Sequence, residues 1–271
     1  MSTETRPSRP GEILDGAFAL YRRHFALFFL LAFLPQLPIA LFWLVAPSLL
    51  RQGTTLGGDL AFWVAPSLVA PFNIFAIVLA MAALTHALSR AIAGETPSFG
   101  EALRAGLRRW VPVAAATVIA WVLIAVGLVL FVVPGLLLLA MWFAIYPVAV
   151  LEERSALGAL RRSTELASGA RTRILGLTVA AWVVVLVPMV ALWLVVGTNA
   201  DARTVMAGGT AAGNAVRVLT LAQVGSTLLA ALTWPFLMAV TLLLYYDRRA
   251  AVPSAAEVPS ATAVRLPAEP A

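Results

Sequence analysis

The chain has 271 residues, of which 61% are hydrophobic, and its mean hydropathy is +0.92. Soluble domains contain about 45–50% apolar residues even when glycine is counted, so this composition excludes a soluble globular protein and indicates an integral membrane protein. The formal net charge is +6, all 19 basic residues are arginine, and the absence of cysteine excludes disulfides, thiolate metal sites and cysteine nucleophiles.

The beginning of the chain does not have the pattern of a secretory signal peptide. Glu4, Glu12 and Asp15 lie where such a signal carries basic charge, and no small-residue cleavage site follows promptly. We therefore expect residues 1–9 to form a disordered N-terminus and the first apolar segment to be retained as a spanning helix.

Six apolar segments follow along the chain. A bilayer core of about 30 Å needs about 20 helical residues, and six segments meet or approach that length. Only Pro134 and Gly135 separate the third segment from the fourth, which predicts a tight antiparallel hairpin. The sequence thus predicts an all-α, polytopic membrane protein with six transmembrane helices in three hairpins. The segments cover residues 25–50, 61–92, 110–133, 136–151, 174–197 and 216–246.

An arginine-bearing stretch precedes each hairpin. In the second of these stretches, Ser98 and Glu101 have the spacing of a capping box, which predicts the start of a helix. In the third, Gly169 predicts the end of a helix. Apolar residues recur at helical spacing in these stretches, which predicts amphipathic helices on the cytoplasmic membrane surface. The pattern predicts a membrane domain over residues 10–249, with repeats at about 10–92, 97–151 and 155–246.

The distribution of arginine predicts the orientation. With six spans both termini share one side, and that side carries sixteen of the nineteen arginines, against Arg51, Arg203 and Arg217 on the other. Cytoplasmic loops are enriched in basic residues, so both termini are predicted to be cytoplasmic, in the inner membrane of a bacterium. The Ala- and Pro-rich tail at 250–271 is predicted to be disordered.

The arginines of the three connecting stretches are the candidate binding residues. Each arginine near an anionic leaflet contributes on the order of 1 kcal/mol of binding. Two compatible interpretations remain open: the helices only anchor the hairpins, or they form a basic rim that binds anionic phospholipid headgroups or an acidic partner. The candidates are Arg22, Arg23, Arg104, Arg108, Arg109, Arg161, Arg162, Arg171 and Arg173.

Little in the sequence favours an enzyme. The acidic residues lie outside the cores of the apolar segments, which argues against a proton-coupled transporter. No phosphate-binding loop, nucleophile elbow or paired-histidine zinc motif is present, so we expect no catalysis, no cofactor and no metal. The basic charge is explained by orientation, and nucleic acid is not an expected partner. Prolines within the segments leave one alternative open, a permease or channel for an apolar or lipid-like solute with kinked helices as moving parts.

Two stretches suggest a family. Residues 11–25, which contain Gly11-Glu12-Ile13-Leu14-Asp15, and the pair 146–152 and 159–166 resemble the membrane domain attached to some bacterial glycerophosphoryl diester phosphodiesterases, as well as related multi-pass proteins of unassigned role. In that family a separate metal-dependent barrel performs hydrolysis, and this sequence lacks the barrel. The resemblance therefore implies a stand-alone membrane module, and it adds a lipid enzyme to the possible partners.

Overall fold

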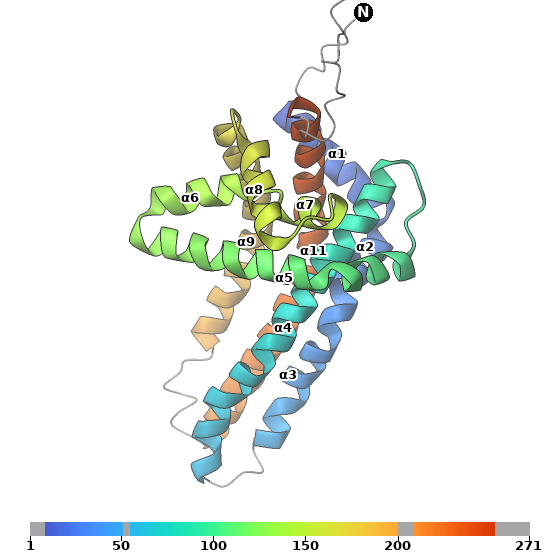
Figure 1. Ribbon diagram of the computed structural model, residues 1–271. Coiled ribbons are helices and arrows are strands. Elements are labelled where there is room, and N and C mark those ends of the chain that lie inside the picture. Colours follow the sequence, from blue (N-terminus) through green and yellow to red (C-terminus); the bar gives the residue numbers. More distant parts are fainter. Residues whose placement is uncertain (1–8, 51–54, 200–208, 253–271) are drawn as a thin grey trace, which may run out of the picture.

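The computed structural model describes residues 9–50, 55–199 and 209–252, and every element in this part of the chain is a helix (Figure 1). The all-α class predicted from sequence is therefore confirmed for these residues. Nearly all of the predicted disordered N-terminus and most of the predicted tail lie outside them. The elements are α1 (Pro10–Arg23), α2 (Phe25–Phe33), the 3₁₀ helix η1 (Leu34–Gln36), α3 (Leu37–Leu50), α4 (Thr55–Ile92), α5 (Phe99–Leu130), α6 (Val132–Met141), α7 (Ile145–Leu151), α8 (Ala156–Ala167), α9 (Arg171–Asn199) and α11 (Gly209–Ala251).

Six stretches of the described residues are helical, long and apolar enough to cross a membrane. Each overlaps one of the six predicted segments, so the prediction of a multi-pass chain holds at the level of length and composition. The stretches are Phe25–Val45, Val69–Ile92, Phe99–Leu130, Val132–Leu151, Arg171–Val196 and Thr220–Ala251.

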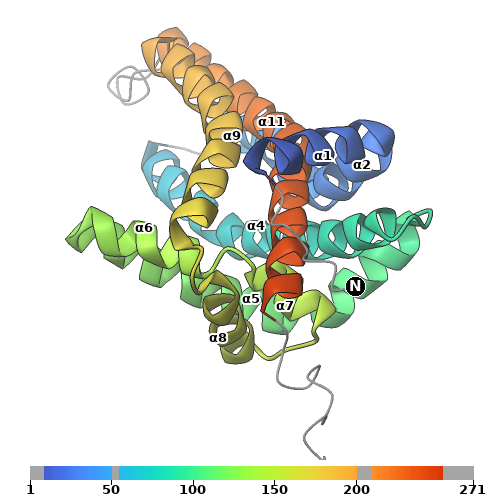
Figure 2. The ribbon, with the colours of Figure 1, turned by 90° about the horizontal axis from the view of Figure 1, so that it is seen from above.

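The helices do not all run in one direction. Helices α3, α4, α9 and α11 extend toward the same end of the molecule, whereas α5 and α6 lie across the direction of α3 and α4 (Figure 1). Seen from above, α9 and α11 run together on one side and α5 and α6 project on another (Figure 2). The start of α1 and the end of α11 lie at the same end of the molecule in the view of Figure 1, but the view from above separates them (Figure 2).

The first apolar stretch is broken where the sequence carries Pro35 and Pro38. Helix α2 ends at Phe33, one 3₁₀ turn follows, and α3 then begins. Proline lacks the N–H that an α-helix needs and disturbs the preceding turn, which explains the change of helix type. Pro188 and Pro235 behave differently, because both lie inside helices that continue through them. Helix α11 nevertheless changes direction along its length (Figure 2).

The fourth apolar stretch is also broken, just before Pro147, which lies in the first turn of α7, where a proline is tolerated. Helix α6 ends at Met141 and α7 begins at Ile145. The Ser163 hydroxyl of α8 bridges this break: it accepts a hydrogen bond from the Ala144 N–H (3.0 Å) and donates one to the Met141 carbonyl (2.9 Å). Ser163 is fully buried, so these bonds satisfy backbone groups that water does not reach.

The turn between α5 and α6 lies at Phe131, which has extended backbone, and not at Pro134-Gly135 as the sequence suggested. Gly135 instead lies inside α6, where a Cβ atom would come within 2.6 Å of the Leu128 backbone nitrogen. Glycine is thus needed because the two helices approach closely, and the antiparallel pair forms by this contact.

The connecting stretches fold in three different ways. Helix α1 is separated from α2 only by His24, and α8 is a separate helix that ends before Gly169, whose φ is +74°. The predicted stop at Gly169 is thus confirmed. In the second stretch, Ser98 occupies the N-cap position as predicted, but its side chain makes no capping hydrogen bond. Here no separate surface helix forms, because α5 continues from the connector into the third apolar stretch.

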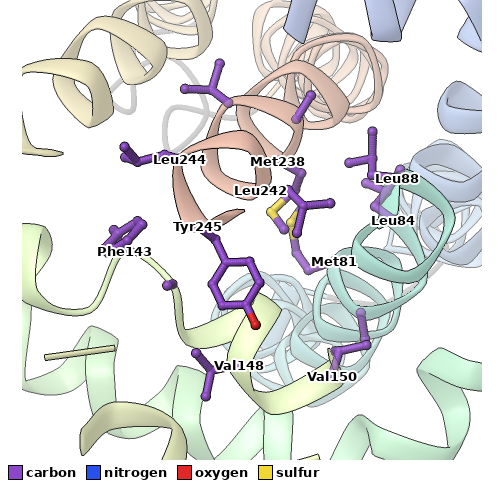
Figure 3. Close-up of a cluster of buried hydrophobic side chains, with 14 of the residues drawn as sticks. Met81, Leu84, Leu88, Phe143, Val148, Val150, Met238, Leu242, Leu244 and Tyr245 are labelled. Carbon is purple, nitrogen blue, oxygen red and sulfur yellow. The ribbon is translucent and has the colours of Figure 1, made fainter. Parts of the chain in front are cut away.

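The core lies where α4, α7 and α11 meet. Leu84 and Leu88 of α4, Val148 of α7, and Leu242 and Tyr245 of α11 are fully buried and lie together (Figure 3). Small alanines on α4 allow the neighbouring helices to pack closely against it. By contrast, α5 and α9 keep large apolar faces exposed, as helices do that contact lipid.

Candidate functional site

A cluster of charged and polar side chains holds α7, α8 and α11 together. Glu152, at the end of α7, accepts a hydrogen bond from the Tyr245 hydroxyl (3.0 Å). Its Oε2 atom lies 3.4 Å from Nε of Arg162, an ion-pair contact without hydrogen-bond geometry, and 3.7 Å from Nε of Arg154. The side chains of Glu152 and Arg162 are 10% and 6% exposed, so the pair is shielded from solvent.

Arg248 and Arg162 also tie α8 to the end of α11. Arg248 donates from Nε to the Leu166 carbonyl (2.9 Å) and from Nη2 to the Ser168 carbonyl (2.7 Å), while Arg162 donates to the Val252 carbonyl (3.0 Å). Leu166 and Ser168 lie at the C-terminus of α8, where the carbonyls lack helical partners and the helix dipole favours a cation. The end of α11 is therefore fixed against α8.

The nine candidate arginines occupy three kinds of environment. Arg161, Arg162 and Arg173 each face a carboxylate; Arg173 donates to Asp247 (2.9 Å), and Arg161 lies 3.4 Å from Glu165. Because these three arginines already face carboxylates, they have fewer free donors for an external anion than the sequence alone indicates. Five others are exposed and make no ion pair with another described residue: Arg22, Arg23, Arg104, Arg108 and Arg171.

Arg109 is the ninth candidate and differs from the rest. Its Nε donates to the Ala149 carbonyl of α7 (3.3 Å), and its Nη2 is buried without a hydrogen-bond partner. A guanidinium carries five N–H donors, and an unsatisfied buried donor of a charged group is costly. Arg109 is thus positioned by α7 and retains capacity to bind an acceptor.

Arg104 and Arg108 lie one helical turn apart on α5, directly before Arg109. Residues four apart share one face of a helix, so their guanidinium groups project from the same side. A phosphate is well suited to such a pair, because arginine presents its donors in a planar fork that matches phosphate oxygens.

An apolar cavity of about 510 Å³ lies between the helices, and sequence reasoning did not find it. Its walls come from α4, α5, α9, α11 and the broken pair α6–α7, and no charged residue lines it. Three tryptophans contribute to its walls, one each from α5, α9 and α11: Trp121, Trp182 and Trp234. Apolar residues in membrane helices are too common to single out such a wall from the sequence.

No group of three His, Cys, Asp or Glu side chains in the described part of the chain could hold a metal ion. No protein-family model matches the chain, and no curated protein or solved structure matches it either.

Proposed function

We propose that this protein is a non-enzymatic, multi-pass membrane protein that binds anionic phospholipid headgroups through its arginines, and so works as a lipid-associated scaffold. The observation that carries the proposal is the uneven pairing of the nine candidate arginines. Five exposed arginines lack a carboxylate partner among the described residues, and Arg109 holds a buried, unpartnered nitrogen. Phosphates of an anionic leaflet are the counter-ions that such groups attract.

The proposed headgroup site is centred on Arg104, Arg108 and Arg109 of α5. Arg109 is held against α7 by the Ala149 carbonyl, which directs it, while the other two side chains extend into solvent or headgroups. Arg104 and Arg108 share one face of α5, and the neighbouring Arg109 adds a third cation beside them, which distinguishes this site from one where single arginines only anchor a helix.

We further propose that the arginine-rich end faces the cytoplasm of a bacterial cell. Two observations support a common side for both chain ends. The start of α1 and the end of α11 lie at the same end of the molecule in the view of Figure 1, and Arg248 joins the end of α11 to α8. The positive-inside tendency then favours the interior for this end. The resemblance to phosphodiesterase membrane domains makes a lipid enzyme a candidate partner there.

Lipid retention tests the headgroup proposal. Purified protein is exchanged into detergent with equal amounts of phosphatidylglycerol and phosphatidylcholine of identical chains, and the lipids that stay bound are counted by native mass spectrometry. We expect phosphatidylglycerol to be preferred. The double variant Arg104→Gln/Arg108→Gln should weaken that preference by about 30-fold, since two arginines contribute about 2 kcal/mol.

Arg90→Gln is the matched control. Arg90 is also exposed, but its Nε lies 2.6 Å from Glu95, so its charge is already compensated. An equal affinity for both headgroups in the wild-type protein, or an equal loss in the double variant and the control, would contradict the proposal.

A second function, a permease or channel for an apolar or lipid-like solute, is favoured by a separate observation. Two of the six apolar stretches are broken, at η1 and between α6 and α7, and broken helices in membrane proteins occur where backbone lines a cavity or moves. A dithionite assay on liposomes that contain fluorescent lipid decides this point. Loss of fluorescence beyond the outer leaflet supports transport, and protection of the inner leaflet argues against it.

A further inference from the structure

We infer that the apolar cavity between α4, α5, α6–α7, α9 and α11 binds one hydrocarbon chain of a membrane phospholipid. This chain site is separate from the arginine site of the proposed function. All of the residues that line the cavity belong to five of the six stretches able to cross a membrane. The molecules that surround such helices are lipids, so a phospholipid chain is the occupant that the position favours.

Two of the four hydroxyl groups in the wall are engaged within their own helices. Thr117 donates to the Val113 carbonyl (2.7 Å), and Thr241 donates to the Leu237 carbonyl (2.9 Å). Neither donor is directed at the cavity, and the remaining wall is dominated by aliphatic and aromatic carbon. The wall therefore offers little to a polar headgroup or to an ion.

Water is a poor occupant of a space with this lining. A buried water needs two to four polar partners, and apolar cavities in proteins stay dry and take up apolar ligands. An empty space is also unfavourable, because the lining atoms lose dispersion contacts. The volume of about 510 Å³ falls within the range of about 300–1,000 Å³ that is typical of small-molecule sites.

The cavity has an apolar rim through which a chain can enter from the side. Trp121 of α5 and Trp182 of α9 meet edge to face, with ring centroids 5.8 Å apart and an interplanar angle of 81°. Trp121 is 44% exposed, and Val118 and Val122 beside it are also exposed while they line the cavity. The cavity wall is thus continuous with the apolar outer surface of α5.

The first experiment fills the cavity. Thr178 lines it from α9, so Thr178→Phe should occupy part of the space, whereas the neighbouring Val179 is exposed outside it and Val179→Phe is the matched control. The protein is exchanged into detergent with phosphatidylglycerol or phosphatidylcholine, and bound lipid is counted by native mass spectrometry. We expect Thr178→Phe to lose one retained lipid with either headgroup, and Val179→Phe to lose none.

These outcomes separate the two sites. If the wild-type protein shows no preference for phosphatidylglycerol but Thr178→Phe still loses one retained lipid, the arginine site is wrong and the chain site stands. Conversely, equal lipid retention by Thr178→Phe, Val179→Phe and the wild-type protein overturns the chain site and leaves the headgroup preference intact.

A second measurement does not depend on a cavity-filling variant that folds. Phosphatidylcholine with one brominated chain is titrated into detergent-solubilised wild-type protein, and tryptophan fluorescence is recorded. We expect quenching that saturates at one lipid per protein and that is largely lost in Trp121→Phe/Trp182→Phe/Trp234→Phe, which keeps the aromatic walls. Quenching that never saturates, that persists in this variant, or that brominated detergent reproduces equally well overturns the chain site.

Discussion

The hydroxyl of Ser163 on α8 accepts a hydrogen bond from the backbone N–H of Ala144, which lies at the break between α6 and α7. Replacing Ser163 with alanine leaves this N–H and the Met141 carbonyl without their partner in a buried place. We expect Ser163→Ala to lower the free energy of unfolding by about 1–3 kcal/mol. The adjacent Thr164→Ala is the control, because the Thr164 hydroxyl only returns to the Leu160 carbonyl of its own helix. Equal losses in thermal stability in detergent would show that the bridge has no special role.

Arg162 and Glu152 form a pair that is shielded from solvent, so removing one partner should cost more than removing both. Arg162→Met leaves the Glu152 carboxylate buried with Arg154 and Tyr245 as its remaining contacts. We expect a loss of about 3–5 kcal/mol for the single variant, and a smaller loss for Arg162→Met/Glu152→Gln. Chemical denaturation in mixed micelles measures both. If the double variant is less stable than the wild-type protein by the sum of the losses of Arg162→Met and Glu152→Gln, the two residues are not directly coupled.

Gly135 allows α6 to approach α5, and a methyl group there would overlap with Leu128. We expect Gly135→Ala to destabilise the protein by about 1–3 kcal/mol, because backbone must move to accept it. Gly176→Ala on α9 is the control, since nothing lies within 4 Å of the added atom and alanine favours a helix by about 0.5–1 kcal/mol over glycine. A melting temperature that rises in both variants would rule out the close contact.

The Tyr21 hydroxyl of α1 donates to the Leu232 carbonyl of α11 (2.8 Å), three residues before Pro235. Burial raises the pKa of Tyr21 above its ordinary value of 10.0. Because the folded state disfavours the phenolate, the stabilisation by Tyr21 is present below pH 10 and is lost as the pH rises through the raised folded-state value. We expect Tyr21→Phe to cost about 0.5–1 kcal/mol at pH 8, since the residue is only partly buried.

The pH dependence of the stability difference between the wild-type protein and Tyr21→Phe tests this account of Tyr21. Melting temperatures of the wild-type protein and Tyr21→Phe are compared between pH 8 and pH 11, and the gap should narrow above pH 10. A gap that widens at alkaline pH would mean that the hydroxyl stabilises the fold in its ionised form, contrary to the geometry.

Several features of this fold could be predicted from local sequence. Length and hydropathy locate the six apolar stretches, since a spanning helix needs only a run of apolar residues. Gly169 ends α8 because left-handed backbone favours glycine, and Ser98 marks the start of α5 by its position. Pro35 and Pro38 indicate the break after α2. Each of these signals acts within a few residues.

The remaining features depend on contacts between distant residues. Pro147 indicates a break before α7, but the bridge across Trp142–Ala144 comes from Ser163, about twenty residues later. Arg161 and Arg162 are neighbours of the same residue type in the sequence. In the structure, however, Arg162 is buried against Glu152 and Arg161 is 85% exposed. The turn between α5 and α6 lies at Phe131, although the sequence suggested a turn at Pro134-Gly135. Gly135 instead lies inside α6, where it allows close contact with Leu128. The cavity depends on five helices at once, which no local pattern encodes.

The central proposal is that the chain is a multi-pass membrane protein with both ends and the arginine-bearing connectors inside the cell. The absence of native cysteine makes single-cysteine labelling clean. Ser98→Cys, Ser155→Cys and Ala251→Cys, expressed in intact cells, should be protected from a membrane-impermeant maleimide until the membrane is permeabilised, while Thr204→Cys, between α9 and α11, should react at once. Labelling of any of the first three positions in intact cells, or protection of residue 204, would contradict the account.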